Sequence, residues 1–159
     1  MEERDIMLTE DGYKKLVEEL QYLKGPRKME VAERIKVARE FGDLSENSEY
    51  EEAKNEQALL EAKIADMEAT IRNAKVVADH EISTRKAGVG TQVTVFDYEF
   101  EEEVTYSIVG ATEVNIAENK ISNESPVGKA LMGKKKGEDF EVETPAGIAK
   151  YKVLDIKRI

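Results

Sequence analysis

The stretch "YEEAKNEQALLEAKIADMEATIRNAKVVA", from Tyr50 to Ala78, decides the fold. Residues that suit the seam of a helix pair recur along it in alternating steps of three and four: Tyr50, Ala53, Gln57, Leu60, Ile64, Met67, Ile71, Ala74 and Ala78. This spacing is typical of a coiled coil, in which one stripe of a helix packs against a partner helix. We therefore expect one long helix here and a second helix beside it.

A matching stripe upstream supplies the partner helix. Thr9 is placed to cap its first turn, and Gly25-Pro26 is expected to bend the helix or begin a new one, because the periodicity resumes beyond it. The stripe comprises Tyr13, Leu16, Leu20 and Leu23 and then, less regularly, Val31, Ile35 and Ala38. The two stripes meet at Gly42, which predicts an antiparallel hairpin with arms about 45 Å long, at about 1.5 Å per residue.

The pattern changes to strands near residue 80. Short segments rich in β-branched and aromatic residues, bounded by glycine or proline, cover residues 92–96, 104–109, 139–143 and 148–156. Thr144-Pro145-Ala146-Gly147 is typical of a hairpin turn, and Ser125-Pro126 of a helix start, with a short helix running to Met132. The sequence predicts an α+β protein: an N-terminal antiparallel coiled-coil hairpin with an acidic tip over residues 1–79, and a mainly antiparallel β domain with one short helix over residues 80–159.

Composition excludes several classes of function. The 159 residues contain no cysteine, so disulfides, thiolate zinc sites and cysteine nucleophiles are ruled out. A net charge of −10 argues against free-standing nucleic-acid binding, so any contact with nucleic acid has to be local. His80 is the only histidine, which gives a Ser-His-Asp triad little support. No apolar run of about 18 residues and no signal peptide occur, so we expect a cytoplasmic protein without a membrane partner.

The junction of the two helical stripes, "FGDLSENSEY" from Phe41 to Tyr50, has two interpretations. In the first, Asp43 is the N-cap of the second helix and Glu46 completes a capping box. In the second, Asp43 and Glu46 form a functional carboxylate pair at the far end of the long hairpin. Two carboxylates do not cage Mg²⁺ alone, because the ion prefers octahedral oxygen ligation, but they can complete a site that another protein provides.

Three segments together resemble the bacterial Gre transcript-cleavage factors. They are "REFGDLSENSEYEEAK" (Arg39 to Lys54), "MLTEDGYKKLVEELQYLK" (from Met7) and "ISNESPVGKALMGKKKGEDFEVETPAG" (from Ile121). The resemblance implies a coiled coil that enters the secondary channel of bacterial RNA polymerase, and an FKBP-like β domain that docks at the channel rim. It also implies that the chain is not itself an enzyme. Asp43 and Glu46 would instead help to hold Mg²⁺ in the polymerase active site, so that the polymerase cleaves the 3′ end of backtracked nascent RNA.

The resemblance assigns further residues. Arg39 and Lys54 would contact the RNA. The alternative is that both are solvent-exposed charges beside the seam residues. The segment Ser125, Pro126 and Val127 would dock on the polymerase. Tip support would come from Phe41, Gly42, Leu44 and Ser45; Ser45 stands where the family often has a basic residue, so the tip is more negative here. Phe41 and Leu44 would wedge the tip in place or close the end of the coiled coil, and apolar burial favours closure.

Two other functions stay open at this point. One is a Gre-like regulator that occupies the same channel but inhibits the polymerase without cleavage. The other is a prolyl isomerase, by analogy with the FKBP-like fold, but the aromatic residues of the β domain need not form one pocket. Three smaller expectations concern the surface and the oligomeric state. Glu30 and Arg34 are expected to form a surface ion pair. Lys134-Lys135-Lys136 suits a solvated turn or, as the less favoured alternative, a contact with an acidic rim of the polymerase. A monomer is expected because the hairpin closes its own seam.

Overall fold

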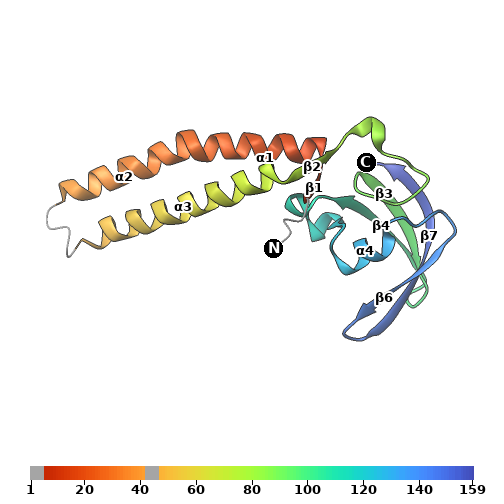
Figure 1. The fold of residues 1–159 in the computed structure, drawn as a ribbon. Coiled ribbons are helices and arrows are strands. Elements are labelled where there is room, and N and C mark those ends of the chain that lie inside the picture. Colours follow the sequence, from red (N-terminus) through yellow and green to blue (C-terminus); the bar gives the residue numbers. More distant parts are fainter. Residues whose placement is uncertain (1–5, 42–46) are drawn as a thin grey trace. The chain divides into compact units, whose positions relative to one another are not determined.

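In a computed structural model, residues 6–41 and 47–159 are described, and Figure 1 shows their elements. By their contacts they form two compact units. One unit is the helical hairpin Lys14–Asn73, and the other contains the chain before Lys14 and after Asn73. The α+β prediction is confirmed, with a helical hairpin in the N-terminal part and a curled sheet in the C-terminal part.

The first arm of the hairpin is continuous through its proline. Helix α1 (Glu10–Tyr22) passes into a π-helical turn (Leu23–Arg27) and then into α2 (Lys28–Glu40). The wider turn accommodates Pro26, which has no N–H to donate. Thr9 caps α1 as expected, since its Oγ1 accepts the Gly12 N–H at 3.0 Å.

Helix α3 (Ser48–Arg72) is the second arm and lies along α2 (Figure 1). The buried residues of the seam are those that the periodicity selects: Leu16, Leu23, Val31, Ile35, Ala38, Ala53, Leu60, Ile64 and Met67. The predicted helix is too long at its C-terminal end: the seam pattern continues to Ala78, but α3 ends at Arg72. Asn73 forms the C-cap, with its N–H donating to the Ala69 carbonyl at 3.0 Å.

The chain enters and leaves the hairpin through a pair of short strands that the sequence did not predict. Strand β1 (Ile6–Thr9) pairs in parallel with β2 (Ala74–Val77), in the register Ile6↔Ala74 to Thr9↔Val77. Ala74 and Ala78, assigned to the helical seam, therefore lie in and after a strand. By their contacts, residues 74–79 belong to the β unit. The predicted division into residues 1–79 and 80–159 places them with the hairpin.

The β unit is a five-stranded sheet in the order β5-β4-β3-β7-β6. The strands are β3 (Thr91–Asp97), β4 (Glu102–Val109), β5 (Lys120–Ser122), β6 (Asp139–Thr144) and β7 (Gly147–Arg158). All neighbours are antiparallel except β4 and β5, which are parallel. Four of the five strands were predicted; β5, with three residues, is too short to show a period.

One helix, α4 (Pro126–Leu131), lies on the concave side of the curled sheet in Figure 1. Its inner residue Leu131 is fully buried, and it joins a core formed by the alternate residues of the strands. That core comprises Ala87, Val89, Val93, Val95, Ile108, Leu131, Phe140, Val142, Val153 and Ile156. Met7 of β1 and Val77 of β2 pack against it, so the strand pair belongs to the same unit.

Candidate functional site at the hairpin tip

The tip connects the end of α2 to the start of α3. Phe41 is the last described residue before it, and its N–H donates to the Ala38 carbonyl at 3.3 Å. Asn47 is the first described residue after it. The predicted metal-completing pair, Asp43 and Glu46, lies outside the described residues, as do Gly42, Leu44 and Ser45.

Asn47 joins the two arms at the tip. Its Oδ1 accepts the N–H of Tyr50 at 3.2 Å, which makes it the N-cap of α3. Its Nδ2 donates to the carbonyl of Ala38, near the end of α2, at 2.6 Å. One side chain therefore satisfies a free N–H at one helix start and gives the Ala38 C=O a second hydrogen bond at the other helix end.

This geometry corrects the capping interpretation of the tip acids. The sequence places a capping box on Asp43 and Glu46, but α3 starts at Ser48 and its N-cap is Asn47. Local spacing favours a box on the acids because Asp43 precedes Glu46 by three residues, whereas the third residue after Asn47 is Tyr50. The N-cap of α3 is therefore a residue outside the predicted acidic pair.

Phe41 does not close the end of the coiled coil. Its side chain is 77 % exposed, whereas Ala38 and Ala53, the buried residues nearest the tip on the described parts of the two arms, are almost fully covered. The expectation that Phe41 would be buried at the end of the coiled coil was therefore wrong. An exposed aromatic ring at the rim of the tip is available for contact with a partner.

The two cations assigned to RNA differ in their surroundings. The guanidinium of Arg39 lies over the ring of Tyr50, 6.0 Å from its centroid, at the outer limit of a cation–π contact. Lys54 Nζ donates to Gln57 Oε1 at 3.1 Å on the exposed surface. Within residues 6–41 and 47–159, neither cation is in an ion pair, so both retain charge that an anion can neutralise.

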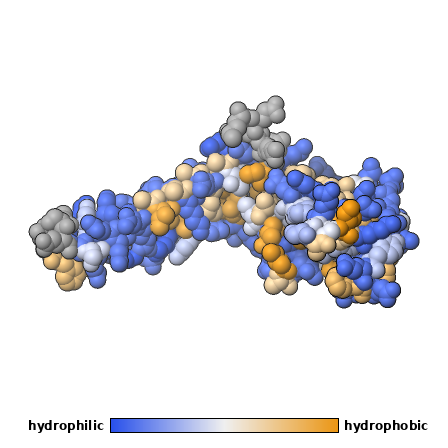
Figure 2. Space-filling view, turned by 90° about the horizontal axis from the view of Figure 1, so that it is seen from below, coloured by the Kyte–Doolittle hydropathy of each residue, from blue (hydrophilic) through white to orange (hydrophobic). Residues whose placement is uncertain are grey.

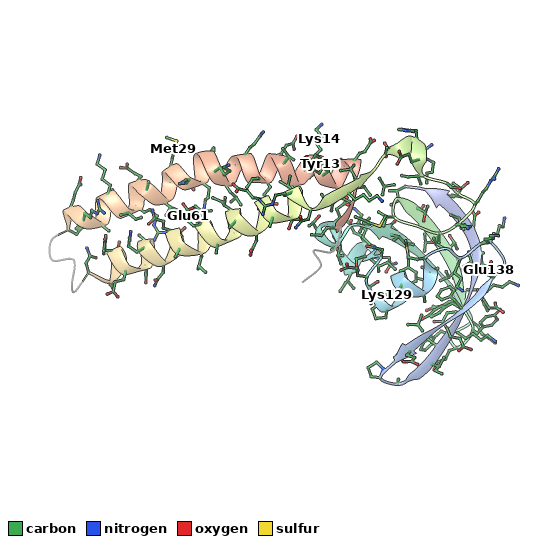
Figure 3. The ribbon with its side chains drawn as sticks, viewed as in Figure 1. Tyr13, Lys14, Met29, Glu61, Lys129 and Glu138 are labelled. Atoms are coloured by element: carbon green, nitrogen blue, oxygen red, sulfur yellow. The ribbon has the colours of Figure 1, made fainter. Side chains whose placement is uncertain are left out.

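Ion pairs between the two arms hold the hairpin in register. The carboxylate of Glu56 binds both Arg27 and Arg34, and it is the least exposed acid among these pairs. Further pairs join Lys24 to Glu68 at 3.0 Å, Lys28 to Glu61 at 3.2 Å and Lys63 to Glu19 at 3.5 Å. Figure 3 shows Glu61 on the side of α3 that faces the other arm, and Met29 pointing away from it.

The expected pair of Glu30 with Arg34 was wrong. Glu30 instead accepts from Arg27 at 2.9 Å, and Arg34 reaches across to Glu56. Spacing within one helix predicted the first partner, whereas the partner from the other arm depends on the register of the hairpin. Figure 2 shows that the outer surface of the arms is mostly hydrophilic, as these charged residues require.

The segment assigned to polymerase docking is a tightly built helix start. Ser125 Oγ accepts the Gly128 N–H at 3.1 Å and donates to the Ser122 carbonyl at 2.7 Å, which confirms the predicted cap. A Cβ on Gly128 would lie 1.9 Å from that same carbonyl, so only glycine fits there. Pro126 is exposed and Val127 packs against the core. Docking by this segment stays a prediction.

The aromatic residues of the β unit form separate pairs. Phe140 stacks on Tyr151 with ring centroids 5.3 Å apart, and Phe96 meets Tyr98 edge to face at 5.5 Å. Tyr98 donates its hydroxyl to Asp139 at 2.8 Å, and this hydrogen bond raises the pKa of Tyr98. A cavity of about 350 Å³ beside Tyr98 is lined by the β6–β7 turn.

The described residues contain neither a metal-binding cluster nor a membrane-spanning helix. In residues 6–41 and 47–159, no group of three or more His, Cys, Asp or Glu side chains is arranged to hold a metal ion. No helix in the same residues is both long and apolar enough to cross a membrane.

Comparison with known proteins gives the same family for both parts of the chain. The family described as "Transcription elongation factor, N-terminal" matches residues 6–76, and the family described as "Transcription elongation factor, GreA/GreB, C-term" matches residues 82–158. A relative from Caldanaerobacter subterraneus subsp. tengcongensis, named transcription elongation factor GreA, is 56 % identical over 155 residues, which cover 98 % of this chain and 99 % of that protein.

Further relatives cover the chain equally well. The protein of the same name from Clostridium acetobutylicum is 53 % identical over 156 residues, covering 98 % of this chain and 99 % of that protein. Among solved structures, GreA factor homolog 1 of Thermus thermophilus is 31 % identical, covers 97 % of this chain and 99 % of its own, and superimposes with a TM-score of 0.45.

Proposed function

Because this chain belongs to the GreA/GreB family of transcription elongation factors, we propose that it stimulates RNA polymerase to cleave the 3′ end of backtracked transcripts. The hairpin enters the secondary channel of the polymerase and carries Asp43 and Glu46 to the active site. The chain is not a nuclease on its own. The observation that supports this most directly is that Asn47, and not Asp43, is the N-cap of α3.

The donor chemistry of the tip fits Mg²⁺ only as part of a shared site. Asp43 and Glu46 offer two carboxylates, and Mg²⁺ in proteins is usually held by one or two carboxylates together with waters and phosphates. When bound between the polymerase and the tip, the ion would activate a water for attack on the phosphodiester. The cofactor is therefore shared with the polymerase and does not reside in the isolated chain.

The remaining tip residues position this pair. Asn47 ties the start of α3 to the Ala38 carbonyl, so the loop that carries the acids leaves from two connected helix ends. The cations of Arg39 and Lys54 neutralise phosphates of the extruded RNA, and the exposed ring of Phe41 contacts the channel wall. In the β unit, Ser125, Pro126 and Val127 dock at the rim of the channel.

The proposal includes a location and an oligomeric state. RNA polymerase is the partner, so the protein acts in the cytoplasm. The buried seam is closed within one chain, which supports a monomer. Light scattering at micromolar concentration tests this, and a stable dimer would contradict it.

The test of the activity uses backtracked elongation complexes of a cognate bacterial RNA polymerase with labelled RNA and Mg²⁺. The variants are Asp43→Asn and Glu46→Gln, which retain shape and remove charge. We expect the wild type to release short 3′ fragments, and both variants to bind the polymerase but to lose at least about 100-fold in cleavage rate, the scale of a lost metal-ligand contact.

One control variant makes the result specific. Glu51→Gln removes one exposed carboxylate from the first turn of α3 without touching the tip pair, and it should cleave like the wild type. A wild type that binds the polymerase and blocks synthesis without releasing fragments would contradict the proposal and identify an inhibitor.

A further inference from the structure

Two basic segments that are far apart in the sequence lie side by side in the β unit. The segment "STRKAG", residues 83–88, contains Arg85 and Lys86, and the turn "GKKKG", residues 133–137, contains three successive lysines. They are joined by two backbone hydrogen bonds: the Ala87 N–H donates to the Lys134 carbonyl at 2.8 Å, and the Gly133 N–H donates to the Ala87 carbonyl at 2.9 Å. We call Arg85, Lys86, Lys134, Lys135 and Lys136 the basic loop pair.

The backbone of the lysine turn is fixed at both ends. Gly133 and Gly137 have φ angles of +80° and +91°, the left-handed region that glycine adopts without strain. The Gly137 N–H donates to the Val153 carbonyl of the core strand β7 at 2.8 Å. The three lysines are thus held as one short cationic arc on a defined loop.

The charges of the basic loop pair are not neutralised by the protein. Arg85, Lys86, Lys135 and Lys136 are exposed. In the part of the chain that the structure describes, none of the ion pairs includes any of the five residues. Glu138, labelled in Figure 3, and Asp139 follow the turn directly, and Asp139 and Glu141 line the same cavity as Lys134. Five cations next to three carboxylates leave an excess of positive charge at this surface, in a chain of net charge −10.

The composition of the two segments favours one class of partner. Protein interfaces are enriched in aromatic and other large apolar residues and depleted in lysine. Residues 83–88 and 133–137 contain no large apolar side chain and four lysines. Clusters of lysine without an apolar anchor suit the phosphate backbone of a nucleic acid, which is bound through charge neutralisation and without base recognition.

We infer that the basic loop pair, Arg85, Lys86 and Lys134 to Lys136, binds the phosphate backbone of a nucleic acid without sequence preference. The site is separate from the tip residues Arg39 and Lys54, and it goes beyond the proposed function, which needs no nucleic-acid contact by the β unit. The negative charge of the rest of the chain opposes long-range attraction, so binding depends strongly on salt and acts when the nucleic acid is already close.

The experiment measures fluorescence anisotropy of a labelled uridine oligomer, and in a second arm of a labelled DNA duplex, with the full chain over a series of salt concentrations from about 20 mM. We expect saturable binding to the oligomer with a log–log salt slope of about −3, since each neutralised phosphate contributes about −0.7. The arm with the tighter binding identifies the source of the phosphates, and binding in either arm supports the inference.

Matched variants locate the site. Lys135→Gln with Lys136→Gln should weaken binding at least about fivefold at low salt and reduce the slope by more than one. Lys14→Gln with Lys75→Gln changes the net charge equally at exposed positions elsewhere and should change the affinity less than about twofold. Circular dichroism checks that both variants fold.

Several results would overturn the inference. These are no binding in either arm at low salt, equal losses in the two double variants, or a loss that occurs only in Arg39→Gln with Lys54→Gln. Tighter binding of labelled poly-glutamate than of either nucleic acid at equal charge concentration would assign the surface to an acidic protein instead. None of these readouts requires transcript cleavage, so the inference and the proposed function fail independently.

Discussion

The side-chain amide of Asn47 bridges the two arms of the hairpin: it caps α3 through Tyr50 and donates to the carbonyl of Ala38 at 2.6 Å. This single residue connects the end of α2 to the first turn of α3. A neutral side chain therefore joins the two described ends of the tip.

Asn47→Ala should loosen the first turn of α3. Loss of an N-cap costs about 1 kcal/mol, so hydrogen exchange at the Tyr50 amide should become about fivefold faster. Asn47→Asp keeps the acceptor for Tyr50 but loses the donor to Ala38, and it should retain most of the protection. Equal exchange rates in wild type and Asn47→Ala would show that the cap does not hold the tip.

Glu56→Gln should lower the stability of the hairpin more than a substitution that breaks only one exposed ion pair. Its carboxylate binds Arg27 and Arg34 and is only 24 % exposed, so we expect a loss of about 1 kcal/mol in low salt and a smaller loss in high salt. Urea unfolding followed by the helical circular dichroism signal measures this. Glu30→Gln, which breaks one pair of a 63 % exposed side chain, is the control and should cost less than about 0.5 kcal/mol.

Gly128→Ala should destabilise the β unit by at least about 2 kcal/mol. The new Cβ would lie 1.9 Å from the Ser122 carbonyl, and backbone must move to relieve that contact. Gly88→Ala is the matched control, because nothing lies within 4 Å of its Cβ. Thermal unfolding of the two variants compares them, and equal melting temperatures would contradict the tight packing at the start of α4.

The pKa of the Tyr98 phenol should fall in Asp139→Asn. The hydroxyl donates to the Asp139 carboxylate, which stabilises the protonated phenol and raises its pKa above 10.0, the usual value. The hydrogen bond is thus present at neutral pH and is lost as the pH rises through the raised pKa. NMR titration of ring-labelled tyrosine follows this residue, and an unchanged midpoint in the variant would show that the contact is weak in solution.

The sequence predicted the parts of the fold that repeat a local pattern. The seam residues from Leu16 to Met67 follow the helical period, and Ser125-Pro126 marks the start of α4 by local cap chemistry. The pairing of β1 with β2 could not be predicted in this way. Each strand has only four residues, and one precedes the hairpin in the sequence whereas the other follows it. The period also continued through Ala74 and Ala78, where alanine suits both a seam and a strand.

The candidate site was predicted less completely than the fold. Motif resemblance selected Asp43 and Glu46, but local spacing also assigned them a capping duty that Asn47 performs. The partners of Arg34 and Glu56 depend on the register between the arms, which no single-helix rule gives. The basic loop pair depends on two backbone hydrogen bonds between distant segments, so the sequence showed only an isolated lysine turn.

The parallel pairing of β1 with β2 has a consequence for the order of folding. The chain between these strands is the whole hairpin, so their direct pairing would require closure of a long and costly loop. Once the arms have associated, the ends of the hairpin are neighbours and the remaining closure is short. The first strand of the chain is thus expected to join the β unit last, after the hairpin that follows it has formed.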